Sequence, residues 1–146
     1  MTVRPIVKLP DPVLKKVSDP VERIDDELRG LVDDMLETMY DAPGIGLAAI
    51  QIGIPRRLLV IDLAKEDQPK DPHAFINPEI VWSRDDTSVY EEGCLSIPGL
   101  RGMVPRHRRI KVKARTIDGE PTSLTADGFH ARVIQHEQDH LDGIVF

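Results

Sequence analysis

The amino-acid sequence predicts an α+β fold in which mainly antiparallel sheets pack on two main helices. Strand-like runs outnumber helical runs, and the strand-rich middle of the chain lacks the regular alternation of strand and helix that indicates a parallel sheet. The composition, with 40% hydrophobic and 30% charged residues among 146, is typical of a globular chain rather than a disordered one. We therefore expect a single domain spanning residues 1–146, without internal repeats or low-complexity segments.

The first half of the chain contains the clearest helix. Asp11-Pro12 has the form of an N-cap followed by proline and predicts a short helix through about Val17. A longer helix is expected from about Asp25 to Tyr40, because six apolar residues recur there at the i, i+3, i+4 spacing of a buried stripe: Leu28, Leu31, Val32, Met35, Leu36 and Met39. Asp41-Ala42-Pro43-Gly44 ends this helix, and a glycine-punctuated apolar stretch follows to Gly53.

The remaining elements are mostly strands. The apolar run Leu58–Leu63 predicts a buried strand, and further strand-like runs occur at 74–76, 79–82 and 88–91. Residues 108–117 and 122–125 flank Asp118-Gly119, which is a strong signal for a hairpin turn. The last helix is expected from about Asp127 to Asp142, with Gly143 as its C-cap.

Charge and cysteine content narrow the class of partner. The formal net charge is −6, and the densest basic run is Arg106–Arg109 with its continuation to Arg115. From Arg109 to Arg115 the charges alternate with apolar residues in the manner of the wet face of a strand. No aromatic residues are interleaved there, so a specific nucleic-acid partner is not expected. No apolar run approaches the ~20 residues of a membrane span, so no membrane partner is expected. A lone cysteine and an N-terminus without a signal-like stretch predict a reducing compartment, with the cytoplasm as the default.

The most informative motif is His136-Glu137-Gln138-Asp139-His140, an H-E-x-x-H pattern. On a helix, positions i and i+4 lie one turn apart on one face, so both imidazoles can bind the same ion. Glu137 lies next to the first histidine, where it can exchange protons with a metal-bound water. The alternative is a polar helix face that carries two solvated histidines.

A catalytic metal site usually has three protein ligands, and the third is expected upstream. Only residues 141–146 follow the motif, and their one carboxylate, Asp142, points elsewhere. Cys94 is the obvious candidate, since Gly93 beside it allows the backbone to approach closely. A lone cysteine is usually a small buried hydrophobe, and a nucleophilic Cys–His pair is a further alternative. Ligation is favoured because it accounts for the thiol and both histidines together.

Three segments in order make the chain resemble the peptide deformylase family. They are Gly44-Ile45-Gly46-Leu47-Ala48-Ala49-Ile50-Gln51, Glu92-Gly93-Cys94-Leu95-Ser96, and Gln135-His136-Glu137-Gln138-Asp139-His140. The similarity extends over essentially the whole chain, and three motifs in the right order are far more specific than H-E-x-x-H alone. The resemblance implies an enzyme that hydrolyses the formyl group from the N-terminal formylmethionine of nascent polypeptides and releases formate. It also implies that the sheets surround a central metal-binding helix.

The resemblance also implies roles for individual residues. Cys94, His136 and His140 are expected to bind the metal, and Glu137 to act as the acid–base group. Gln51 and the backbone N–H of Leu95 take the oxyanion role, which suits amide donors. A loop amide without a role is the alternative for Gln51. Glu92 and Asp139 are candidates to support the ligands by pairing with Arg106, and an exposed carboxylate is the alternative for each.

Six residues are expected to bind substrate: Ile45, Gly46, Arg101, Phe129, Arg132 and Val133. Arg132 departs from the apolar residue that many relatives have in the methionine pocket, so we expect its methylenes to pack inward and its guanidinium to lie at the rim. The segment after Pro98 also resembles one subgroup of deformylases more than the commonest bacterial form. Many relatives continue past the position of Phe146 as a C-terminal helix associated with docking at the ribosome, so ribosome association is not expected here.

The metal and the rival functions remain open at this point. The ligand set suits Zn²⁺, Fe²⁺, Co²⁺ or Ni²⁺, and the resemblance points to Fe²⁺ as the working ion. One rival is a small metalloprotease that uses the same helix, which the missing downstream ligand disfavours. The other is a protein that binds formyl-peptides or metal without turnover, which the complete catalytic set disfavours. The expected partners are formylated nascent peptides, and the expected state is a monomer.

Overall fold

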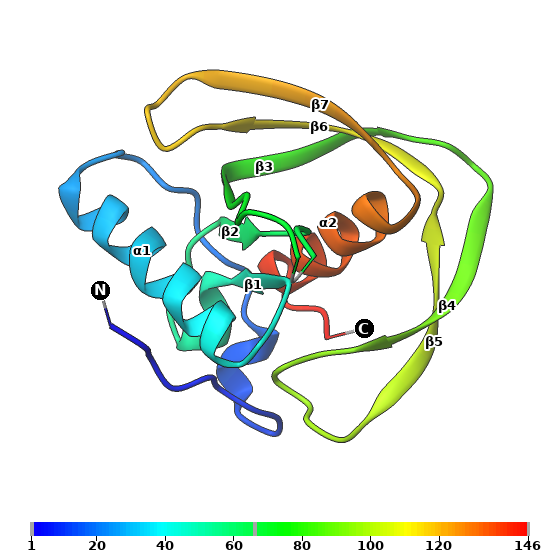
Figure 1. The fold of residues 1–146 in the computed structure, drawn as a ribbon, viewed down its shortest axis with the longest axis horizontal. Coiled ribbons are helices and arrows are strands. Elements are labelled where there is room, and N and C mark those ends of the chain that lie inside the picture. The colour runs from blue at the N-terminus through cyan, green and yellow to red at the C-terminus, as the bar shows by residue number, and fades with distance from the viewer. Residues whose placement is uncertain (1, 66, 146) are drawn as a thin grey trace.

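The fold is described from a computed structural model, which covers residues 2–65 and 67–145. A five-stranded antiparallel sheet lies between two helices, α1 (Asp26–Asp41) and α2 (Gly128–Leu141), and a separate two-stranded ribbon flanks α2 on its other side (Figure 1). The predicted α+β class with mainly antiparallel sheets is confirmed. Within the described ranges, none of the helices is both long enough and apolar enough to cross a membrane.

All four side chains of strand β2 (Leu58–Ile61) are buried, and the strand lies between two hydrophobic cores. Side chains alternate between the two faces of a strand, so Leu58 and Val60 pack with the stripe of α1 while Leu59 and Ile61 pack toward α2. Five of the six predicted stripe residues of α1 are buried, Leu28, Leu31, Val32, Met35 and Met39, and Leu36 is partly buried. Asp25 caps this helix by accepting a hydrogen bond from the Leu28 N–H at 3.0 Å.

The strand order of the main sheet is β1-β2-β3-β6-β7. β3 (His73–Ser83) is one strand where the sequence suggested two, because register shifts and Asn77, at a φ of 51°, interrupt its pattern without ending it. β6 (Arg109–Arg115) and β7 (Pro121–Asp127) form the predicted hairpin. The charged residues of β6 are exposed and its apolar residues buried, which confirms that Arg109–Arg115 is the wet face of a strand. Arg106, at the start of the basic run, is instead buried on β5.

Two strands were not predicted. β1 (Gly46–Ala48) is only three residues long and lies within the glycine-punctuated stretch, where it forms the edge of the main sheet before the short 3-10 turn η2 (Ala49–Ile52). β5 (Arg101–His107) pairs with β4 (Thr87–Gly93) to make the ribbon. Its basic residues and a proline obscured the alternation in the sequence. The predicted short helix after Asp11 is a single 3-10 turn, η1 (Pro12–Lys15).

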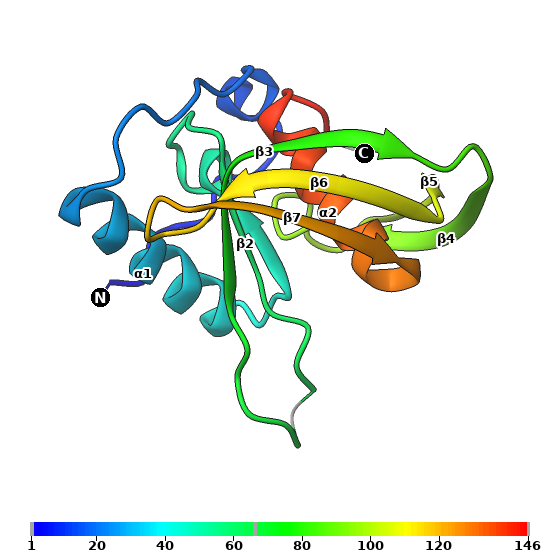
Figure 2. The same ribbon diagram turned by 90° about the horizontal axis from the view of Figure 1, so that it is seen from above.

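Helix α2 is the central element of the site, and most of its residues are buried. One side packs on the main sheet and another faces the ribbon (Figure 2). Gly143, at a φ of 78°, follows the helix in the left-handed conformation that favours glycine. A Cβ at Gly143 would lie 2.5 Å from the carbonyl oxygen of Lys15, so the close approach of η1 also requires glycine there.

Candidate metal centre and active site

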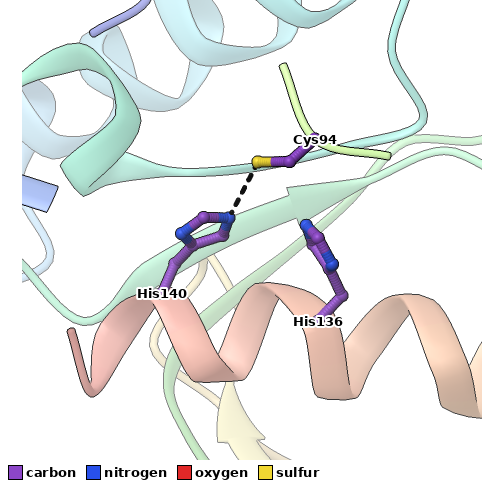
Figure 3. A group of neighbouring side chains, drawn as sticks. All are labelled: Cys94, His136 and His140. Atoms are coloured by element: carbon purple, nitrogen blue, oxygen red, sulfur yellow. Dashed lines mark hydrogen bonds between the residues drawn. The ribbon is translucent and has the colours of Figure 1, made fainter. Parts of the chain in front are cut away.

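Two elements that are distant in the sequence bring the three predicted ligands together. His136 and His140 rise from one face of α2 toward Cys94, which follows directly after β4 (Figure 3). Cys94 Sγ lies 3.4 Å from His140 Nε2, and the ligand atoms of all three residues lie within 4.8 Å of one another.

The donor set fits a tetrahedral metal ion. Bonds of about 2.3 Å to sulfur and about 2.0 Å to nitrogen place those two atoms roughly 3.5 Å apart, close to the observed separation of Cys94 and His140. His140 is fully buried, and its Nδ1 makes no hydrogen bond to the described residues. Burial, with the positive charges of His136 and Arg106, lowers the pKa of His140 to about 3, so this imidazole is neutral, as ligation requires.

Glu92 on β4 orients the other histidine. It accepts hydrogen bonds from His136 Nδ1 at 2.9 Å, from Arg106 at 3.0 and 3.2 Å and from Arg132 at 2.5 Å. Burial alone would raise the pKa of Glu92, but hydrogen bonds from His136, Arg106 and Arg132 outweigh burial and lower the pKa to about 2. An ionised carboxylate only accepts hydrogen bonds, so the proton of His136 stays on Nδ1 and Nε2 faces the ligand cluster.

The anionic surroundings of His136 favour a positive charge at Nε2, which either a proton or a bound metal ion would supply. Burial lowers the pKa of His136, but hydrogen bonds to Cys94 and Glu92 outweigh it and raise the pKa to about 10. Asp139 also forms an ion pair with Arg106, so the predicted pairing of Glu92 and Asp139 with this arginine is observed. Buried charges of this kind are stable only when they are paired and hydrogen-bonded, as they are here.

Glu137 lies beside the ligand cluster without belonging to it. Its Oε1 is 3.8 Å from His136 Nε2, and its Oε2 is buried without a hydrogen-bond partner among the described residues. Burial raises the pKa of Glu137 to about 7, although His136 and Arg106 oppose this shift. Gly46 on β1 makes room for the carboxyl, since a Cβ there would lie 3.1–3.3 Å from Glu137 Cγ, Cδ and Oε2.

Gln51 directs its amide at the same cluster. Its Oε1 accepts the Ala48 N–H at 2.9 Å, which orients Nε2 toward Cys94 Sγ at 3.6 Å and Ser96 Oγ at 3.2 Å. The side chain is 1% exposed, so Gln51 is not a solvated loop amide. Leu95 follows Cys94 in a turn closed by a hydrogen bond from the Ile97 N–H to the Cys94 carbonyl.

A cavity of about 540 Å³ opens above these groups and has a mainly apolar lining. All six predicted substrate-binding residues line it: Ile45, Gly46, Arg101, Phe129, Arg132 and Val133. Sequence reasoning missed other lining residues, Pro43, Gly44, Ile97, Gly99 and Leu100, of which the last three directly follow the Cys94 motif. Their position shortly after that motif was the signal in the sequence that could have identified them as cavity-lining residues.

The predicted orientation of Arg132 was wrong. Its side chain is buried, and the guanidinium donates hydrogen bonds to the ribbon instead of lying at the rim. Arg101, in contrast, is exposed at the mouth of the cavity and pairs loosely with Glu91 at 3.4 Å. The Arg132 guanidinium turns away from the rim because both strands of the ribbon supply backbone carbonyls close to α2, Ser88 from β4 and Val104 from β5, and the sequence did not reveal β5.

Comparisons with known proteins agree with this geometry. The profile of the polypeptide deformylase family matches residues 3–146. The chain is 60% identical to a peptide deformylase of Brucella suis biovar 1 (strain 1330), over all of this chain and 83% of that protein. A crystal structure of a peptide deformylase from Legionella pneumophila has a TM-score of 0.94 at 44% identity, covering 99% of this chain and 84% of that one. The class I type b peptide deformylase of Acinetobacter baumannii, with Met-Ala-Ser bound, has a TM-score of 0.92 at 37% identity, covering 99% and 96%.

Proposed function

The chain belongs to the polypeptide deformylase family, and from that premise we propose how its residues remove the N-terminal formyl group from nascent peptides. The observation that supports the proposal best is the convergence of Cys94, His136 and His140 with the buried carboxyl of Glu137 at one cavity. Family membership makes the protein a metal-dependent hydrolase that acts on formylmethionine and releases formate.

We propose that Cys94 Sγ and the Nε2 atoms of His136 and His140 hold one divalent ion. A thiolate with two imidazoles suits Fe²⁺, our choice for the working metal, and suits Zn²⁺, Ni²⁺ or Co²⁺ as substitutes. A bound ion of this kind supplies Lewis-acid chemistry, lowering the pKa of a coordinated water and polarising a carbonyl. Metal analysis of anaerobically purified protein tests the choice of metal.

Glu137 moves the proton in the proposed mechanism. As the attacking water forms the new C–O bond, its proton passes to the Glu137 carboxylate, and Glu137 then returns the proton to the amine as the C–N bond breaks. The products are formate and a peptide with a free N-terminus. A pKa of about 7 supports this role, because a general acid–base group is most effective when its pKa is near the working pH.

Gln51 and Leu95 stabilise the charge that develops on the formyl oxygen. Attack on the carbonyl makes that oxygen negative, and N–H donors that are already oriented lower the barrier most. The bond from Ala48 fixes the Gln51 carboxamide, so Nε2 stays directed at the cluster, and the N–H that contacts Cys94 Sγ at 3.6 Å would donate to the formyl oxygen instead. The N–H of Leu95 is the second donor in this proposal.

The cavity sets the substrate preference. β1 is an edge strand, so the outer backbone groups of Gly46 can pair with an extended peptide, and Ile45 lines the cavity directly before this strand. Phe129, Val133 and the methylenes of Arg132 would surround the first side chain, and an unbranched methionine suits this apolar slot. We place Arg101 beside the peptide at the mouth of the cavity.

We further propose that residues 1–146 act as one catalytic domain and as a monomer, since one chain supplies every group named above. A thiol that must remain reduced to bind metal supports the cytoplasm as the compartment.

Formate release from formyl-Met-Ala-Ser, measured with and without a chelator, tests the proposed function. We expect turnover that the chelator abolishes and that added Fe²⁺ or Co²⁺ restores. Acetyl-Met-Ala-Ser serves as the control substrate, because it keeps the amide and the methionine while it removes the formyl hydrogen. Turnover that is insensitive to metal removal, or equal turnover of both peptides, would contradict the proposal.

A further inference from the structure

Arg132 makes a set of contacts that substrate binding does not explain. Its Nη1 donates to Glu92 Oε2 at 2.5 Å and to the Val104 carbonyl at 2.8 Å. Its Nη2 donates to the Ser88 carbonyl at 2.6 Å and to Ser88 Oγ at 3.3 Å, and the guanidinium carbon lies 5.2 Å from the centre of the Tyr90 ring. One side chain of α2 therefore contacts both strands of the β4–β5 ribbon.

The register of the ribbon explains how a single guanidinium reaches so many groups. Ser88, Tyr90 and Glu92 are alternate residues of β4, so they share the face that lies toward α2. Val104 is paired with Tyr90 and lies on the same face. The planar, forked guanidinium presents donors in two directions within one plane, which a lysine ammonium cannot do.

The ribbon forms one wall of the active-site cavity and carries a metal ligand at its end. Glu91, Glu92 and Gly93 of β4 and Arg101 of β5 line the cavity, and Cys94 follows Gly93 directly. The ribbon is also a separate two-stranded sheet without ladder hydrogen bonds to the main sheet. Backbone hydrogen bonds from Arg84 N–H to Arg109 and from Arg108 N–H to Asp86 hold the end of the ribbon that joins β3 and β6. The position of the rest of the ribbon relative to α2 depends on side-chain contacts, and a two-stranded ribbon by itself is only marginally ordered.

We propose that Arg132 is a positioning residue that clamps the β4–β5 ribbon against α2. The clamp fixes the cavity wall, and through Glu92 and the adjoining Cys94 it fixes the ligand geometry. With its guanidinium held by the ribbon, Arg132 presents only its methylenes to the slot, so an arginine is compatible with an apolar pocket. This inference rests on the proposed function of the same site.

The test compares Arg132→Met, Arg132→Lys and Tyr90→Leu with the control Arg109→Met. Arg109 forms an exposed ion pair with Asp127 on the main sheet, so its replacement removes an arginine without affecting the ribbon. Four quantities are measured on each purified protein: KM and kcat for formyl-Met-Ala-Ser, the rate of metal release to a chelator, and the thiolate-to-Co²⁺ absorption band of the cobalt form. Thermal melting is recorded alongside.

We expect Arg132→Met to raise KM and the metal-release rate by about 10-fold and to shift the cobalt band. Loss of groups that orient ligands directly costs 10–100-fold, and Arg132 acts one contact further out. Arg132→Lys should show smaller rises in KM and in the metal-release rate than Arg132→Met, because one ammonium can still bind one strand. Tyr90→Leu should change both quantities by about 2–5-fold, which corresponds to losing an exposed cation–π contact. Arg109→Met should match the wild type within about 2-fold.

A purely structural role for Arg132 would lower the melting temperature and leave KM, metal release and the cobalt band of the folded protein unchanged. That result in Arg132→Met and Arg132→Lys would overturn the clamp, as would equal effects of Arg109→Met. If both Arg132 variants fail to fold, Tyr90→Leu decides alone, because Tyr90 is 63% exposed and its loss leaves no buried cavity. Metal release and the cobalt band need no substrate, so a wild-type protein without deformylase activity would contradict the proposed function and leave the clamp testable.

Discussion

Gly46→Ala is the smallest change that should disable the proposed acid–base group. The added methyl would lie 3.1 Å from Glu137 Cγ, 3.2 Å from Cδ and 3.3 Å from Oε2. Ordinary carbon–carbon contacts are 3.5–4.0 Å, so the Glu137 carboxyl must move by a few tenths of an ångström. Since a misplacement of 1 Å can cost about 10²-fold in rate, we expect kcat to fall by roughly 10-fold.

The matched control is Gly30→Ala, which adds the same methyl in the middle of α1. A Cβ at Gly30 would meet nothing within 4 Å, and alanine is the better helix former by about 1 kcal/mol. We therefore expect Gly30→Ala to be slightly more stable than the wild type and equally active.

Steady-state kinetics, metal content and melting temperature are measured for both variants. Normal metal content with reduced kcat in Gly46→Ala would support displacement of Glu137. A rise in KM alone would show that the methyl blocks the peptide instead. Wild-type kcat and KM in a folded, metal-loaded Gly46→Ala protein would refute the assigned contact between β1 and the acid–base group.

Three further predictions concern the ligands, the acid–base group and acid stability. Cys94→Ala should lose its metal on purification, and stoichiometric metal in that variant would show that the ligand assignment is wrong. Glu137→Gln should keep its metal and its fold while kcat falls by about 10²-fold or more, and near-normal turnover would exclude the acid–base role. Asp62, outside the site, accepts hydrogen bonds from the Tyr40 hydroxyl and from the Ala64 and Asp71 N–H groups; these outweigh the effect of burial and lower the pKa of Asp62 below 3.8. The stability that ionised Asp62 contributes is therefore present above pH 3.8 and is lost as the pH falls through the lowered pKa. Asp62→Asn should reduce the free energy of unfolding at pH 7 and make that free energy decline less steeply in acid. Denaturant titration at a series of pH values measures both effects. If the free energy of unfolding of Asp62→Asn declines in acid as steeply as that of the wild type, this account of Asp62 is wrong.

Much of the fold followed from local patterns. The apolar stripe of α1 predicted both the helix and its buried face, because the 3.6-residue period admits only one such face. Asp118-Gly119 predicted the β6–β7 hairpin, since few other dipeptides adopt that turn readily. β1 and β5 escaped prediction for different reasons. β1 is too short to show a period, while β5 buries the charged Arg106 and exposes Met103 and Pro105, which is the reverse of the usual pattern.

The sequence alone determined that His136 and His140 share a helix face, because their spacing is a property of the helix itself. Whether Cys94 would meet them was decided by tertiary structure, since 46 residues separate its thiol from the His140 imidazole that it approaches at 3.4 Å. The same holds for the Arg132 guanidinium, whose acceptors are the carboxylate of Glu92 and two backbone carbonyls of the ribbon. Backbone carbonyls occur in every residue and leave no trace in the sequence, so the partners of a buried arginine become known only when the strands that carry them are in place.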